Sequence, residues 1–584
     1  MDLQLTAVHR VNTDADGRRL LLGEWCRIFG DAPRNSGDEI IPYHWDDRQK
    51  LTRDYLYLKQ LYEEALASLG KALNVLHDVQ FSERYWRIIL GPWLHWFLVA
   101  VFDRMECLRR AAESARVTSV HVWETPYGSF TPNDMGQFSR AAVGDAYNHV
   151  LFSRLIQRTR ILPFSTTPCA TGLSSIMPVP AGDGKRQRSR WNLNNLAVHW
   201  NRYVFPASSL SNVRLVLRLG QLPWNEVGEE PSDYPMEVGK RKGLQFQLVK
   251  HNQYEELIEA LVPEQVPKAY VEGYRSMRTR AKELFPRHAK VICTSTGYWQ
   301  AEFFKFWAAE QREKGAAYAI VQHGGTYGMA RWFFEEEHQR KSADIFYSWG
   351  WRAGIRENVR PLPSPYLSTI KGSISPLCKG KIVLIESTNP RYAYHLYATY
   401  IGASGYAAYL AGHFAFIRAL QPPVRKALEI RLYRQDYGMR QAARFRSEFP
   451  DVACDCGTDN LFQKMRASRL LITTYNGTTF LESFSCNFPT ILFWDPKVWE
   501  LRTEAEPFFR ELGEVGIFHS SATAAAGFVN DIFSDPMHWW MTEPVQKARR
   551  RFCGRFAQTS RRWSRVWSEE LRQVYSGRER STIV

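Results

Sequence analysis

Short apolar runs and longer helical patterns alternate along most of the chain. The runs that read as strands lie at residues 289–295, 317–325, 342–350, 380–387, 428–435, 468–474, 489–495 and 515–521. Helical patterns separate most of them, and this alternation predicts parallel sheets covered by helices. We therefore expect an α/β fold with two facing Rossmann-like domains.

Residues 46–115 follow a helical pattern instead, in which Leu51, Tyr55, Leu58 and Tyr62 recur at spacings of three or four. The helix after it is apolar on most sides, so we expect it to be buried as a helical insertion in the N-terminal domain. Its longest apolar stretch, 88–102, is shorter than the ~20 residues that a membrane span needs, which favours a soluble protein.

The rest of the N-terminal half has weaker patterns. We expect strands at 119–124 and 213–220, helices at 138–157 and 254–285, and an exposed loop at 166–190. Pro and Ser mark residues 360–379 as a linker. The predicted division is an N-terminal domain at 1–359, a C-terminal domain at 380–543, and a helical tail rich in Arg and Trp at 544–584 that packs back across the domains.

Composition adds a charge signal. The 584 residues include 76 Lys and Arg against 60 Asp and Glu, a net charge of +16. Such a balance suits a phosphate-bearing ligand, a nucleic acid or an anionic membrane face. The nine cysteines have no zinc-type spacing, and the N-terminus has no signal-peptide pattern, so we expect a cytoplasmic protein without a structural metal.

The most informative candidate site follows the strand at 468–474. Asn476 and Gly477 lead into Thr478 and Thr479 at the start of a helix, where hydroxyls, free N–H groups and the helix dipole favour a phosphate. Glu482, one turn later, is a capping partner or a ligand for ribose hydroxyls. An ordinary capped turn between strand and helix remains the alternative.

A second candidate site ends the strand at 317–325. His323 is followed by Gly324, Gly325 and Thr326. A histidine titrates near neutral pH, and two glycines fill no space in a core. This pattern favours a catalytic or phosphate-binding histidine over a core histidine.

Other polar groups lie at the ends of predicted strands. Arg431, Arg434 and Asp436 accompany one strand, and Glu386 and Ser387 end another. Arginine suits bidentate recognition of phosphate, although a structural Arg–Asp pair and a capped helix entrance explain these residues about as well.

Two carboxylates in the N-terminal domain are candidates for a base or nucleophile. Glu124 ends the strand at 119–124, and Asp134 lies in the loop that follows. The acidic run from Glu335 to His338 suggests a metal site, but such runs are more often solvated faces. We therefore predict no metal site.

Six segments together resemble a transferase family of bacterial surface-polysaccharide gene clusters. They are YHWDDR (43–48), LGPWL (90–94), QHGGTYG (322–328), ADIFYSWGW (343–351), RLYRQDYG (431–438) and NGTTFLE (476–482). That family is similar in layout to GT-B glycosyltransferases. The resemblance implies a GT-B fold, a nucleotide-activated donor in the C-terminal domain and an acceptor glycan in the N-terminal one.

Within this broad group, sialyltransferase-like and Kdo transferase-like enzymes use CMP-activated acidic sugars. The His-Pro motif that such enzymes often carry is not evident here, and RLYRQDYG occupies the comparable strand. We expect a metal-independent glycosyltransferase without a cofactor, which moves an acidic sugar such as Kdo or a nonulosonic acid onto a glycan or lipid-linked glycan. His323, Glu124, Asp134 and Asp436 are its predicted catalytic residues.

Two other functions remain open at this point. One is a teichoic-acid type transferase that moves a polyol phosphate from a CDP-activated donor. The other is a non-enzymatic nucleic-acid-binding protein, which the charge and aromatic content permit and the absence of an RNA-binding motif disfavours. The basic tail also suggests peripheral contact with the inner leaflet of the membrane.

Overall fold

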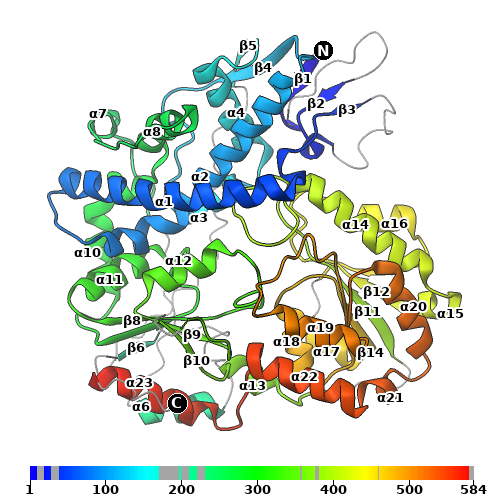
Figure 1. The fold of residues 1–584 in the computed structure, drawn as a ribbon. Coiled ribbons are helices and arrows are strands. Elements are labelled where there is room, and N and C mark those ends of the chain that lie inside the picture. The colour runs from blue at the N-terminus through cyan, green and yellow to red at the C-terminus, as the bar shows by residue number, and fades with distance from the viewer. Residues whose placement is uncertain are drawn as a thin grey trace.

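Three parallel sheets and a layer of long helices make up the protein (Figure 1). This computed structural model describes residues 1–8, 19–27, 38–169, 196–198, 210–219, 231–354, 358–374, 380–457 and 460–577. Every strand pairing between named strands in these residues is parallel. The prediction of an α/β fold with parallel sheets is confirmed.

The first sheet has the order β3-β2-β1-β4-β5. Its strands are β1 (Asp2–Gln4), β2 (Leu20–Leu21), β3 (Glu39–Ile40), β4 (Ser119–Glu124) and β5 (Ser165–Pro168). Two short 3₁₀ helices, η1 (Glu24–Cys26) and η2 (His44–Asp46), and the helices α3 (Met135–Ala141) and α4 (Asp145–Thr159) accompany it. Only β4 was predicted, because the other strands are too short to show an alternating pattern.

Two long antiparallel helices, α1 (Arg48–His77) and α2 (Glu83–Glu113), cross the middle of the molecule between the first sheet and the other two (Figure 1). By length and composition α2 is able to cross a membrane, yet its whole apolar window is buried inside the protein. The expectation that this helix is buried is confirmed. Pro92 lies inside α2 without ending the helix.

The second sheet has the order β10-β9-β8-β7-β6. Its strands are β6 (Leu196–Val198), β7 (Val291–Thr294), β8 (Ala317–Val321), β9 (Ile345–Ser348) and β10 (Val359–Pro361). The helices around it are α6 (Leu210–Leu219), α7 (Val238–Lys242), α8 (Gln253–Gln265), α9 (Lys268–Val271), α10 (Tyr274–Leu284), α11 (Glu302–Glu313) and α12 (Phe334–Ser342). Alternate residues of β7 join the cores on opposite faces: Ile292 on the face with α2 and α11, and Val291 and Cys293 on the other.

The third sheet has the order β13-β12-β11-β14-β15-β16, the doubly wound order of a Rossmann fold. Its strands are β11 (Lys381–Ile385), β12 (Leu428–Arg431), β13 (Ala453–Asp455), β14 (Ser468–Thr473), β15 (Thr490–Phe493) and β16 (Phe518–His519). Its helices are α13 (Pro365–Ile370), α14 (Gly402–Ala419), α15 (Pro422–Ala427), α16 (Gln441–Glu448), α17 (Leu461–Arg466), α18 (Thr478–Ser485), α19 (Glu506–Glu514), α20 (Ala522–Ile532) and α21 (Pro536–Trp540).

The predicted tail consists of two helices that pack on different sheets. The first, α22 (Glu543–Phe556), contacts α18 and α19 beside the third sheet. The second, α23 (Trp563–Ser576), packs with α6 on the second sheet, where Trp563, Trp567 and Leu571 are buried. The prediction of a helical C-terminal tail is confirmed.

Several local predictions were wrong. Residues 213–219 of the predicted strand at 213–220 belong to helix α6, and residue 220 lies outside the described part of the chain. Leu215 and Leu219 are buried four residues apart, while Leu217 between them is 74% exposed. The helix predicted at 138–157 is interrupted before Gly144, and the one at 254–285 is divided into α8, α9 and α10. The predicted loop at 166–190 begins within β5, and its residues 170–190 lie outside the described part of the chain.

The domain boundaries stay a prediction, with two observations that bear on them. Residues 1–359 contain two separate sheets where a single Rossmann-like domain was expected. The predicted linker, 360–379, contains the end of β10 and helix α13, and its residues 375–379 lie outside the described part.

Candidate active site between two sheets

The carboxyl ends of β8 and β14 meet, so that loops 150 residues apart in the chain touch. The backbone N–H of Gly325 donates to Thr478 Oγ1 at 2.9 Å, and the hydroxyl of Thr326 donates to the carbonyl of Asn476 at 2.6 Å. A Cβ atom on Gly325 would lie 2.1 Å from the carbonyl oxygen of Gly477. Gly325 is therefore required by the close approach of two backbones.

Hydrogen bonds within the protein occupy several polar groups of the predicted phosphate pocket. Besides the Gly325–Thr478 bond, Thr479 Oγ1 shares a 2.7 Å hydrogen bond with the hydroxyl of Tyr475. The carboxylate of Glu482 accepts a 2.5 Å hydrogen bond from Tyr366. Phosphate binding at this turn stays a prediction, and it would require a ligand to replace contacts within the protein.

His323 follows β8 beside this contact. Its Nδ1 lies 3.2 Å from the hydroxyl of Tyr327, and its ring lies 6.3 Å from that of Tyr298. The side-chain amide of Gln339 donates to both tyrosine hydroxyls at 2.7 Å, which fixes their positions. Burial lowers the pKa of His323 to about 4. The imidazole is therefore neutral at pH 7 and can still donate or accept a hydrogen bond, and the predicted catalytic or phosphate-binding role of His323 stays a prediction.

Glu335, at the start of α12, has the properties expected of a general base. Burial raises the pKa of Glu335 to about 7. Burial also raises the pKa values of Tyr298, Tyr327 and Tyr397, and the charge of Glu335 adds to the increase. In the described structure its carboxylate makes no hydrogen bond or ion pair. Its proton can therefore be exchanged near neutral pH, which suits acid–base catalysis.

The loop after β11, in the third sheet, adds two further side chains beside these residues. Residues Phe333 and Tyr397 form a β-bridge, and the ring of His395 stacks on Tyr397 at 5.2 Å. Burial lowers the pKa of His395 to about 4, so it is also neutral at pH 7. We call this group the acid–base cluster; its members are Tyr298, His323, Tyr327, Glu335, His395 and Tyr397.

Most of this cluster was not foreseen. The sequence predicts Glu335 as part of a solvated acidic face, but the two phenylalanines directly before it are buried. That apolar start of the helix was the signal for a partly buried carboxyl group. Tyr298, His395 and Tyr397 lie in loops, and their proximity depends on packing between two sheets.

Comparisons with known proteins identify the family. A family model described as LIC12162 family transferase matches residues 1–571. The chain belongs to this family. The prediction of a transferase family is thereby confirmed, and no curated protein sequence matches.

Solved structures give weaker similarities. MurG of Acinetobacter baumannii is 11% identical, with 78% of this chain and 99% of MurG covered and a TM-score of 0.30. WaaG, described as a glycosyltransferase involved in lipopolysaccharide biosynthesis, is 12% identical, with 65% and 98% covered and a TM-score of 0.29. The Thermobaculum terrenum O-GlcNAc transferase is 11% identical, with 90% and 99% covered and a TM-score of 0.33. Scores this low establish no shared activity.

Other predicted residues of this LIC12162 family transferase lie in the third sheet. Glu386 ends β11 at the crevice beside β14, where the strand order reverses, and it is buried with His413 Nδ1 2.6 Å away. The backbone of Ser387 bonds to the hydroxyls of Tyr400 and Tyr409. Both residues stand at the edge where doubly wound sheets bind ligands, and their donor-binding role stays a prediction.

The residues predicted along β12 have mainly structural contacts. Arg431 is paired with Asp455 at 2.8 Å, as the alternative reading proposed, and Arg434 is exposed. Asp436 accepts hydrogen bonds from the backbone N–H groups of Arg440 and Gln441 at 2.7 and 2.8 Å. Asp436 therefore caps the start of α16, and these contacts give it no catalytic partner.

The two N-terminal carboxylates belong to the first sheet and its loops. Glu124 is exposed at the end of β4. Asp134 is the N-cap of α3, where it accepts from the backbone N–H of Gln137 at 2.7 Å. Among the described residues, no hydrogen bond or ion pair links either carboxylate to the acid–base cluster. A carboxylate after a strand serves as a helix cap as readily as it serves catalysis.

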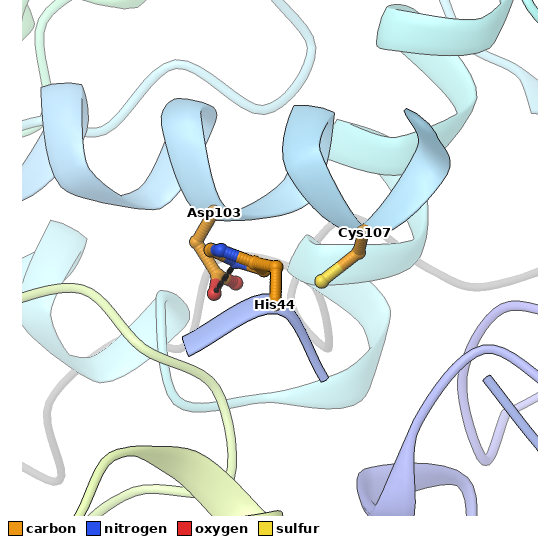
Figure 2. A group of neighbouring side chains, drawn as sticks. All are labelled: His44, Asp103 and Cys107. Atoms are coloured by element: carbon orange, nitrogen blue, oxygen red, sulfur yellow. Dashed lines mark hydrogen bonds and ion pairs between the residues drawn. The ribbon is translucent and has the colours of Figure 1, made fainter. Parts of the chain in front are cut away.

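One group in this transferase has the geometry of a possible metal site. His44, Asp103 and Cys107 place their ligand atoms within 4.8 Å of one another, and Figure 2 shows His44 bonded to Asp103. Asp103 also accepts from the Tyr43 hydroxyl at 2.5 Å and from Arg104 at 2.8 Å. Burial raises the pKa of Cys107, so the thiol stays protonated. A guanidinium and a protonated thiol fit a metal ion poorly.

Proposed function

We propose that the protein transfers a sugar from a nucleotide-activated donor to a cell-surface glycan precursor. The observation that carries the proposal is the acid–base cluster, which lies where the carboxyl ends of two parallel sheets face each other. Ligands of such sheets bind at this edge, and a transferase of two substrates needs a site that both can reach. The GT-B resemblance of the sequence supports the same layout.

Glu335 is the general base of the proposed reaction. Its carboxylate accepts the proton of the acceptor hydroxyl while that oxygen forms the new bond to the anomeric carbon. The bond between the anomeric carbon and the donor phosphate breaks, and its electron pair leaves with the phosphate. His323, neutral and held by Tyr327, offers a hydrogen bond in the same cluster. Neither role depends on a metal ion, and metal independence is part of the proposal.

The donor is proposed to be a CMP-activated acidic sugar such as Kdo or a nonulosonic acid. The net charge of +16 favours an anionic donor. Calorimetric titration of the protein with CMP, CDP, UDP and GDP tests this choice. Selective binding of CDP would favour the transfer of polyol phosphate instead.

Glu335→Gln tests the reaction itself. It removes the base without changing shape, and we expect nucleotide release in the presence of acceptor to fall about 100-fold. The matched control is Glu337→Gln, because Glu337 lies on the same helix but is paired with Lys59 and Tyr55. Equal rates in both variants would remove Glu335 from the mechanism.

A further inference from the structure

A cavity of about 520 Å³ lies beside the third sheet and shares no lining residue with the acid–base cluster. Its walls come from η2 and the start of α1, from α14, and from the segments that follow β14 and β15. It therefore lies at the ligand-binding edge of the third sheet and includes residues of the N-terminal half. Its volume is in the range of small-molecule sites. We call it the α14 pocket.

Aromatic side chains dominate the wall of the α14 pocket. They are Trp45, Tyr400, Tyr409, Phe493, Trp494 and Trp499. Such rings offer flat apolar faces and, in Tyr and Trp, one polar atom each. The indole N–H of Trp494 is buried and makes no hydrogen bond in the described structure. A buried donor without a partner is costly, so it marks a position where a ligand acceptor would be favourable.

The polar groups of the pocket are mainly acceptors and hydroxyls. Asp46 accepts hydrogen bonds from Ser404 at 2.8 and 2.9 Å, and burial raises the pKa of Asp46. Thr474 shares a 2.5 Å hydrogen bond with Tyr409. Carboxylate and hydroxyl oxygens from η2, from α14 and from the segment after β14 suit a ligand with several hydroxyl groups.

The charges of the pocket do not suit a phosphate. Arg48 is committed to the carbonyls of Thr399 and Val498 and to Glu500, at 2.9 to 3.0 Å. Lys497 remains, and it is matched by the carboxylates of Asp46 and Asp495 in the same wall. A phosphate site normally presents a surplus of cationic donors, and here two carboxylates balance Lys497. Among the described lining residues, the buried N–H donors without a partner are those of Trp494 and of Arg48 Nε.

We propose that the α14 pocket binds an uncharged sugar residue. Its aromatic faces contact the C–H surface of the ring, and Asp46, Ser404 and Thr474 bond to its hydroxyls. Because the proposed donor sugar is acidic, an uncharged sugar would belong to the acceptor glycan. The inference therefore rests on the proposed function and deepens it. A nucleoside also stacks on aromatic rings, and the experiment distinguishes the two.

Ala408→Trp is the test variant. Ala408 is exposed on α14 and lines the pocket, so a tryptophan there fills the cavity without disturbing the core. Ala407→Trp is the matched control, because Ala407 is equally exposed on the next position of the helix and lies outside the lining. Unchanged melting temperatures check that both variants fold.

The probes are the methyl glycosides of glucose, galactose, mannose and N-acetylglucosamine, measured by saturation-transfer NMR, with CMP and UDP measured by calorimetry. We expect wild type and Ala407→Trp to bind at least one glycoside, and Ala408→Trp to lose at least tenfold in affinity. Nucleotide affinities should stay within twofold.

Two results would overturn the inference: no glycoside binding to wild type, or loss of nucleotide binding in Ala408→Trp. Failure of the proposed function is a separate outcome, because it appears as absent turnover with all donors. In that case glycoside binding that depends on position 408 still supports the pocket.

Discussion

The acid–base properties of Glu335 follow from its position at the start of α12. The helix starts with the buried Phe334, so the next side chain is held half-buried among tyrosines with no cation beside it in the described structure. Asp134 and Asp436 show the opposite case, because their carboxylates bond to the first N–H groups of a helix. The sequence shows that all three side chains are carboxylic acids. Their burial and hydrogen-bond partners, which the sequence does not show, decide which one can act as a base.

The rate of the wild-type enzyme should depend on the ionisation of Glu335. With a pKa of about 7, the carboxylate fraction grows as pH rises from 6 to 8. We expect kcat/KM to increase about tenfold per pH unit below 7 and to level off above it. Glu335→Gln should lose this rise. A flat wild-type profile over the same range would contradict the assignment.

At the scale of elements, the helical layer is organised around α2. Gly91 and Pro92 lie in its buried middle, and a Cβ atom on Gly91 would lie 2.3 Å from the ring of His338 on α12. The side chain of His338 also lies 3.2 Å from the hydroxyl of Tyr62 on α1. One histidine thus joins three helices. The apolar pattern predicted that α2 is buried, whereas its partners depend on tertiary packing.

His338 should make this layer sensitive to acid. Burial lowers the pKa of His338 to about 3, from the usual value of 6.5. Its stabilising contribution is therefore complete above pH 6.5 and is lost as pH falls toward 3. Between pH 7.5 and 5, we expect the free energy of unfolding to fall by roughly 2 kcal/mol more in wild type than in His338→Gln. Parallel pH profiles in denaturant titrations would refute this.

At the scale of the whole molecule, the strands with long apolar runs were predicted, and their spatial relations were not. The central strands β7, β8, β11 and β14 are buried on both faces, so their sequences are clear. The short strands β2, β3 and β10 have two or three residues each, too few to show an alternating pattern. The contact between Gly325 and Gly477 joins two such sheets, and no local pattern indicates it.

Gly325→Ala should separate the two sheets at this contact. The added Cβ would lie 2.1 Å from the backbone oxygen of Gly477, so one loop has to move. Overpacking of this kind costs about 1–3 kcal/mol, and the displaced His323 loop should lower turnover at least tenfold. Gly324→Ala is the control, because its Cβ meets only Thr478 Oγ1 at 3.1 Å. Similar melting temperatures and rates for the two variants would show that the contact is dispensable.

The burial of side chains in α23 decides which groups of the tail could contact a membrane. Trp563 and Trp567 of α23 are buried, and the exposed cations near them include Arg561, Arg562 and Arg565. Contact with the inner leaflet remains a proposal, and it would rest on these arginines and not on the aromatic rings.

Helix α23 covers the face of the second sheet that contains Val291, Cys293 and Val321, and it comes long after those strands in the chain. While the protein is being synthesised, that face has no cover from α23 until the ribosome has completed the entire third sheet. Helix α6, which precedes these strands, contributes Leu215 and Leu219 to the same core, so the nascent chain leaves exposed only the part of this face that α23 later covers. A chaperone that binds this apolar surface would act during that period of translation.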